Sequence, residues 1–153
     1  MPEDHGLADQ VRRLADIDEI AQLKAQYCRC VDTKDWDGLG ALITDDFRAV
    51  TEGGVHEGRD AMVAFLSGAL GDAVTVHQVH QPEVTFTGAD HADVIWAMND
   101  YVELSLGDTP LVIRGYGHYH EGYVRTADGW RMQCTELKRL RVDTEGPMPA
   151  AAE

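Results

Sequence analysis

The second half of the chain is a series of long segments rich in β-branched and aromatic residues, and this feature constrains the fold more than any other. The segments begin after Gly71 and are separated by short turn signals at residues 88–90, 107–110 and 127–129. Strands joined by such short turns pair antiparallel, so we predict a long antiparallel meander. The segments are VTVHQVH, EVTFT, ADVIWAMNDYVEL, LVIRGYGHYHEGYVRT and WRMQCTELKRLRV.

Helical periodicity is strongest near the start of the chain. Apolar residues recur there at intervals of three to four, which predicts a helix over residues 17–31 with Tyr27 in its buried stripe. Asp16 is the expected N-cap, and Glu19 stands three residues later at the spacing of a capping box.

Two shorter helices are expected, one after Asp35 in WDGLGALI and one over residues 59–70, with two short strands around Gly53 and Gly54. Helices segregated from long antiparallel strands indicate an α+β fold. We expect a strongly curved antiparallel sheet wrapped around the long N-terminal helix, enclosing a cavity between that helix and the concave face.

The chain has the length and balance of one domain, which we place at residues 16–143 between flexible segments at 1–15 and 144–153. Thirteen basic and 27 acidic residues give a net charge of −14. No basic patch stands out, so neither nucleic acid nor a membrane surface is an expected partner. The N-terminus lacks the pattern of a signal peptide, and a cytoplasmic location is the expectation.

Cysteine and histidine spacing does not indicate a metal site. Cys28, Cys30 and Cys134 match no zinc or redox pattern and are expected to be reduced. His118 and His120 stand two apart on one face of a strand, but no third ligand is indicated, and a solvated outer face is the simpler interpretation. We therefore expect no metal.

His77 and Asp32 are the first candidates for chemistry. Histidine accepts and returns protons near neutral pH, and a carboxylate bound to one ring nitrogen leaves the other nitrogen as a general base. Tyr27 precedes Asp32 by five residues, so both face one cavity only if the helix loosens near its end. The alternatives are a surface imidazole and an ordinary helix-end aspartate.

Asp100 is a further candidate because period two places it on the same strand face as Val94, Trp96 and Met98. A carboxylate on an apolar face is either paired or functional. It donates a hydrogen bond only if an apolar site raises its pKa enough to keep it protonated. The alternative is a bulge that turns Asp100 outward.

The layout resembles the SnoaL-like branch of the NTF2-like superfamily from Ile17 to Val142. The resemblance is carried by YCRCVDTKDW, VTVHQVHQPEV, VIWAMNDYVEL, RGYGHYHEGYVR and GWRMQCTELKRLRV. It implies a cone-shaped fold and lyases of the bile acid 7α-dehydratase and scytalone dehydratase type, which need no cofactor and form dimers or trimers.

The resemblance also implies roles for individual residues. Asp32 and His77 match a catalytic dyad, while Tyr27 and Asp100 match groups that bind the reacting oxygens. The side chains expected to contact a small hydrophobic cyclic substrate, steroid- or polyketide-like, are Trp36, Phe65, Trp96, Met98, Tyr119, Arg125 and one of Arg139 or Arg141. Tyr27 occupies the position of a lysine in the related dehydrochlorinase, which argues against dehydrochlorination.

These features predict a dehydratase that removes water from a β-hydroxy carbonyl compound. Two alternatives remain, because fold alone does not determine function. One is an isomerase or polyketide cyclase that uses the same dyad, and the other is a binding module without catalysis.

Overall fold

A computed structural model describes residues 6–147 of the protein. The order of elements, in which two helices and a strand pair precede a third helix and a meander, is the predicted one. The meander has four strands, because the expected segments VTVHQVH and EVTFT form one strand over residues 74–86. The elements are α1 (Leu7–Thr33), α2 (Trp36–Gly40), β1 (Ile43–Thr51), β2 (Gly54–Glu57), α3 (Arg59–Leu70), β3 (Val74–Phe86), β4 (His91–Leu106), β5 (Thr109–Thr126) and β6 (Gly129–Glu145).

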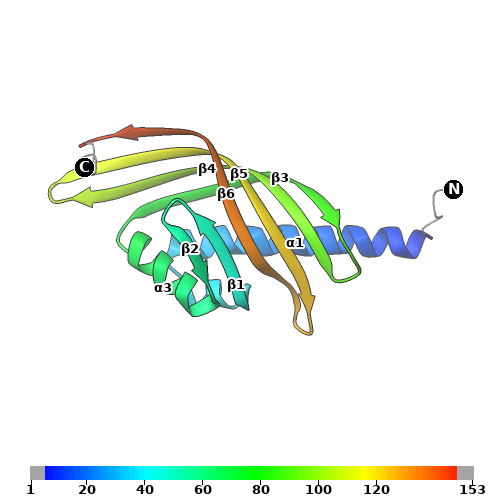
Figure 1. Ribbon diagram of the computed structural model, residues 1–153. Coiled ribbons are helices and arrows are strands. Elements are labelled where there is room, and N and C mark those ends of the chain that lie inside the picture. The colour runs from blue at the N-terminus through cyan, green and yellow to red at the C-terminus, as the bar shows by residue number, and fades with distance from the viewer. Residues whose placement is uncertain (1–5, 148–153) are drawn as a thin grey trace.

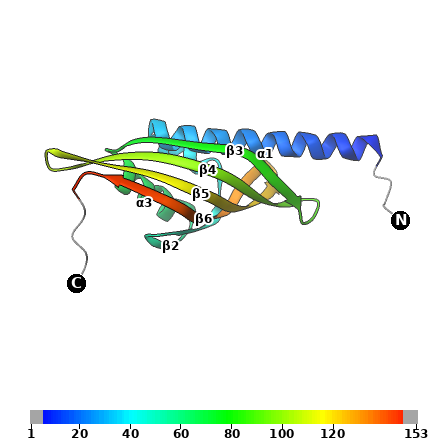
Figure 2. The same cartoon turned by 90° about the horizontal axis from the view of Figure 1, so that it is seen from above.

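The strands form one curved, open sheet in the order β2-β1-β6-β5-β4-β3, with α1 lying along its concave side (Figures 1 and 2). The meander from β3 to β6 is antiparallel, as predicted, whereas β1 joins β6 in parallel. The expected α+β fold with a curved sheet around a long helix is confirmed.

Helix α1 begins ten residues earlier than the predicted start at residue 17. Residues 6–15 are all exposed, and this part of α1 projects beyond the sheet (Figures 1 and 2). Leu7, Val11 and Leu14 stand there at helical spacing, but all three side chains are exposed and do not join the core, so the prediction missed this part of the helix. Of the two segments expected to be flexible, residues 1–5 and 148–153 lie outside the described residues, while residues 144 and 145 end β6.

Strand β3 contains a β-bulge between Val79 and Pro82. Val79 lies opposite Met98 and Pro82 opposite Trp96, so β3 contains one residue more than β4 over this stretch. His80 and the residue after it are both exposed, and the burial pattern shifts from odd to even positions there. The bulge therefore changes which residues of β3 face the helix.

The core lies between α1, α2, α3 and the concave face of the sheet. Its largest fully buried side chains include Trp96, Trp130, Tyr123 and Phe47. A cavity lies between the C-terminal half of α1, α3, the β1–β2 hairpin and the strands β3 to β6. Among the described residues, no helix combines the length and the apolar character required to span a bilayer.

Candidate active site

Asp32 and His77 are in direct contact at the junction of α1 and β3. The His77 Nδ1 lies 2.7 Å from Asp32 Oδ1, and the backbone N–H of His77 donates to Asp32 Oδ2 at 2.8 Å. Asp32 lies in the last turn of α1, where the helix is continuous to Thr33 and then ends at Lys34 in the left-handed region. The expected loosening of the helix is therefore absent, and β3 instead brings His77 to Asp32.

Asp32 is held as a carboxylate by its hydrogen bonds. Burial alone raises the pKa of Asp32, but the bonds from the His77 ring, the His77 backbone and the Thr75 hydroxyl outweigh this and lower the pKa. Thr75 donates to Asp32 Oδ1 at 3.0 Å and accepts from Lys34 Nζ at 2.9 Å. An ionised carboxylate only accepts, so His77 Nδ1 is the donor, and within residues 6–147 no hydrogen bond occupies Nε2.

His77 lies between two hollows: it lines a cavity of about 250 Å³, which Asp32 does not line, and it shares with Asp32 a groove on the outer side of α1 and β3. The predicted residues Tyr27, Phe65, Asp100, Tyr119 and Arg139 also line the cavity. The rest of the lining is mostly apolar and comprises Val31, Val50, Thr51, Glu52, Gly53, Met62, Leu66, Leu70, Val102, Thr135 and Leu137.

The phenols of Tyr27 and Tyr119 are available as donors. Among the described residues no hydrogen bond occupies either hydroxyl. Burial raises the pKa of both, so both stay protonated at neutral pH. The Lys24 ammonium lies over both rings, 4.5 Å from the centroid of Tyr27 and 3.9 Å from that of Tyr119.

Lys24 is fully buried and pairs with Glu121 at 2.6 Å. Glu121 also accepts from the Tyr123 hydroxyl at 2.6 Å and the Thr135 hydroxyl at 2.9 Å. Sequence reasoning missed this pair, although period two places Glu121 on the same face as Tyr119 and Tyr123. The network fixes the cavity floor beneath the two free phenols.

Asp100 faces the cavity as predicted but is not a hydrogen-bond donor. Arg139 donates to both of its oxygens at 2.9 Å, which is the geometry of an ionised carboxylate. Burial lowers the pKa of Arg139, but the bonds to Asp100 outweigh this and raise it. Arg141 points away from the cavity and pairs with Asp143, so Arg139 is the arginine that reaches the site.

Gly115 makes room for this ion pair. A Cβ at Gly115 would collide with the Arg139 guanidinium and the Asp100 carboxylate. At Gly115 the group that approaches the backbone therefore belongs to the protein itself.

Three of the residues expected to bind substrate do not line the cavity. Trp96 and Met98 are buried, 2% and 4% exposed, and the core fills the space around Trp96. Trp36 packs partly against the same core and borders a surface depression between α2 and α3. Trp96 and Met98 thus face inward but lie outside the cavity, and Trp36 lies nearer the surface.

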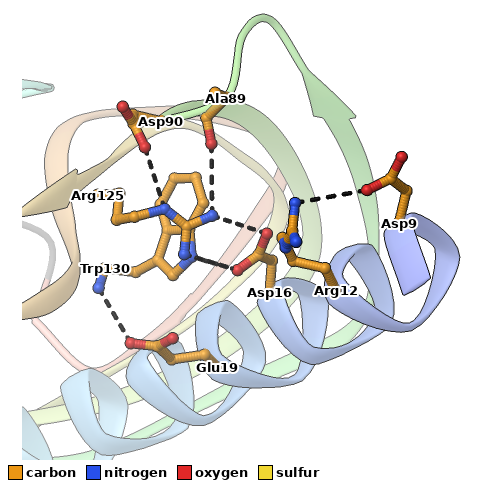
Figure 3. Close-up of polar contacts among 8 residues, drawn as sticks. All are labelled: Asp9, Arg12, Asp16, Glu19, Ala89, Asp90, Arg125 and Trp130. Carbon is orange, nitrogen blue, oxygen red and sulfur yellow. Dashed lines mark hydrogen bonds and ion pairs between the residues drawn. The ribbon is translucent and has the colours of Figure 1, made fainter.

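Arg125 lies at the other end of the fold and is likewise not part of the cavity (Figure 3). Its guanidinium donates to both oxygens of Asp16, at 2.9 and 2.8 Å, and to Asp90 at 3.1 Å. The Trp130 indole N–H also donates to Asp16, at 3.0 Å, and its backbone N–H donates to Glu19. Asp16 and Glu19 thus do not cap α1; they tie its middle to β5 and β6.

In the part of the chain that the structure describes, no three histidine, cysteine or acidic side chains gather to hold a metal ion. Cys28 and Cys30 are buried and Cys134 is exposed, all as free thiols. Burial raises the pKa of the Cys28 thiol, which disfavours its reactive thiolate form. The groups able to carry chemistry are therefore the side chains at the cavity.

Residues 12–136 match the sequence profile of the SnoaL-like domain. The chain belongs to the SnoaL-like family. A curated relative of this SnoaL-like protein is the probable cyclase FGR4 of Gibberella zeae, which is 26% identical over 133 residues and covers 79% of this chain and 89% of its own.

Solved structures show the same fold. A hexachlorocyclohexane dehydrochlorinase (LinA, type 2) superimposes with a TM-score of 0.79 at 19% identity over 94% of the SnoaL-like chain and 99% of its own. A scytalone dehydratase-like protein of Novosphingobium aromaticivorans superimposes with a TM-score of 0.75 at 19% identity, over 92% of this chain and 97% of its own. At this identity the likeness concerns the fold alone.

Proposed function

We propose that the protein is an acid/base enzyme that needs no cofactor and removes water from a small cyclic β-hydroxy carbonyl compound. The observation that carries the proposal is the position of His77. Its Nδ1 is bound to an ionised Asp32 that does not line the cavity, while His77 itself is one of the lining residues. In the proposal Nε2 is the general base that acts on a molecule bound in the cavity.

In the proposed reaction His77 Nε2 takes the proton from the carbon next to the carbonyl group. Asp32 stabilises the imidazolium that results. The phenols of Tyr27 and Tyr119 donate to the carbonyl oxygen as negative charge develops on it. The β carbon–oxygen bond then breaks, and the hydroxyl leaves as water with the proton returned by His77.

The test measures the turnover of a hydroxytetralone, which carries its hydroxyl β to the carbonyl, by the wild type and by three variants of the full chain. We expect His77→Ala to lower kcat by about 10²–10⁴-fold and Asp32→Asn to lower it by removing the supporting charge. His80→Ala is the matched control, because His80 faces outward and contacts Asn99. Mass spectrometry must show the loss of one water, and circular dichroism must show native folding. Full turnover in both dyad variants would contradict the proposal.

The alternative is an isomerase or cyclase that uses the same dyad, and the resemblance to the probable cyclase of Gibberella zeae favours it. A product with the mass of the substrate would identify that reaction. A binding module would return its ligand unchanged. The proposal includes assembly as a dimer or trimer, which light scattering at micromolar concentration tests.

A further inference from the structure

Resting on the proposed function, we infer that the substrate is an electrically neutral molecule of one or two rings, and that Asp100 sets this preference by neutralising Arg139. The inference starts from the charges around the cavity. Arg139 is the cation among the described lining residues, apart from whatever charge His77 gains. Its fixed charge would be the natural partner of an anionic substrate.

Asp100 already occupies the place that a substrate carboxylate would take. Bidentate pairing is the geometry in which guanidinium groups recognise carboxylates, and Asp100 uses both Nη atoms of Arg139 in this way. The Asp100 side chain is only 3% exposed, and the missing side chain of Gly115 gives the pair its space. A second carboxylate would enter the cavity without a free partner, which is costly.

The cavity rim adds further negative charge. Glu52 lines the cavity with a side chain that is 76% exposed, and its Oε1 lies 3.7 Å from Arg139 Nε. Arg139 therefore faces two carboxylates, and the local balance is negative. The net charge of −14 over the whole chain also disfavours the approach of anions.

The size of the cavity limits the substrate independently of its charge. Ligand pockets commonly measure about 300–1,000 Å³, and this cavity measures about 250 Å³. A cavity at the small end of this range suits one or two rings better than the four fused rings of a steroid. The free donors, Tyr27 and Tyr119, suit an uncharged carbonyl oxygen.

The test uses two probes of nearly equal shape, methyl naphthyl ketone and naphthoate, whose binding to the full chain is measured by calorimetry at pH 7. We expect the wild type to bind the ketone at least about ten-fold more tightly. In Asp100→Asn the Arg139 charge is released, and naphthoate should bind at least about ten-fold more tightly than to wild type, as one charge-assisted hydrogen bond allows. Ketone affinity should change much less.

Equal or preferred binding of naphthoate by the wild type overturns the inference, as does a folded Asp100→Asn protein with no gain for naphthoate. Should Asp100→Asn fail to fold, Glu52→Gln decides, because this side chain is exposed. We expect it to raise naphthoate affinity by about two- to five-fold, and no rise overturns the inference. Displacement of the naphthyl ketone by a four-ring steroid ketone contradicts the size limit.

This binding test is separate from the test of catalysis, because methyl naphthyl ketone has no leaving group. A preference for the ketone together with no turnover of the hydroxytetralone retains the inference for the ligand and rejects the dehydratase. Turnover that depends on the dyad, together with equal binding of naphthoate, retains the dehydratase and rejects the inference for the ligand.

Discussion

At the scale of single residues, Gly115 gives a direct test of the site's architecture. A Cβ there meets Arg139 Nη1 and Asp100 Oδ1, so Gly115→Ala must displace the ion pair. Overpacking of this kind costs about 1–3 kcal/mol, and we expect that loss in the free energy of unfolding measured by urea denaturation. Binding of methyl naphthyl ketone should weaken as well.

Gly68→Ala is the matched control. Gly68 lies inside α3, and a Cβ there meets nothing within 4 Å. Alanine is the better helix former, so this variant should gain about 0.5–1 kcal/mol. An unchanged urea midpoint in Gly115→Ala would show that the ion pair moves aside without cost.

The same residues show what the sequence can predict about the site. Period two correctly places Asp100 on the inner face, and a carboxylate near the end of the first helix correctly suggests a partner for His77. Which arginine meets Asp100 depends on a register shift between Tyr116 and Gly117, opposite β6. No local pattern reveals that irregularity, so the sequence alone leaves Arg139 and Arg141 equivalent.

At the scale of elements, the Lys24–Glu121 pair joins α1 to β5 through the core. Both side chains are at most 1% exposed. Removing one partner leaves the other charge buried and unpaired, so Lys24→Met or Glu121→Gln alone should cost about 3–5 kcal/mol. The double variant, which combines Lys24→Met with Glu121→Gln, should recover part of this loss.

The measurement is a double-mutant cycle by urea denaturation. Strictly additive losses would show that the two charges do not depend on each other. The pair also shows a limit of prediction from patterns. Lys24 is polar yet fully buried. Its contacts with Glu121 and with the Tyr119 ring across the fold explain this, and a helical stripe read from apolar residues does not reveal them.

The long strands and turns were predictable because each turn signal is local, and residues 59–70 were predicted as a helix at their observed bounds. The start of α1 was missed, although Leu7, Val11 and Leu14 stand at helical spacing, because this short apolar stripe is exposed and is not part of the core. Arg125 was misplaced for a related reason. The end of β5 lies far from the cavity, and only the curvature of the sheet decides which end of a strand reaches it.

At the scale of the whole molecule, the cluster around Asp16 should make stability depend on acid pH (Figure 3). Burial raises the pKa of Asp16, but hydrogen bonds from Arg125 and Trp130 outweigh it and lower the pKa below its ordinary value. A lowered native pKa gives stability that is present above the unfolded pKa and is lost as the pH falls through the native one. We expect the free energy of unfolding to fall below about pH 4.

Asp16→Asn should lose about 1.5–3 kcal/mol at pH 7, as expected for hydrogen bonds to a charged group, and its stability should fall less steeply below about pH 4 than that of the wild type. Asp32 has a lowered pKa too, so some slope remains. Asp18→Asn is the control, because Asp18 is exposed and its carboxylate accepts a hydrogen bond from Gln22 on the same helix. Urea titrations at several pH values give the free energy of unfolding as a function of pH. Parallel curves of this free energy for Asp16→Asn and the wild type would contradict the prediction.

The bulge in β3 has a consequence for changes in chain length. Inward residues occupy odd positions up to Val79 and even positions from Pro82 onward, with one extra residue between them. Deleting Gln81 should therefore leave a regular strand in which His77 still meets Asp32 and Phe86 still meets the core. Deleting Thr85 should reverse one set and unfold the protein. The measurement is the midpoint of thermal unfolding of each deletion variant. We expect β3 to tolerate the loss of one codon at position 81 and not the loss of one at position 85, four codons away.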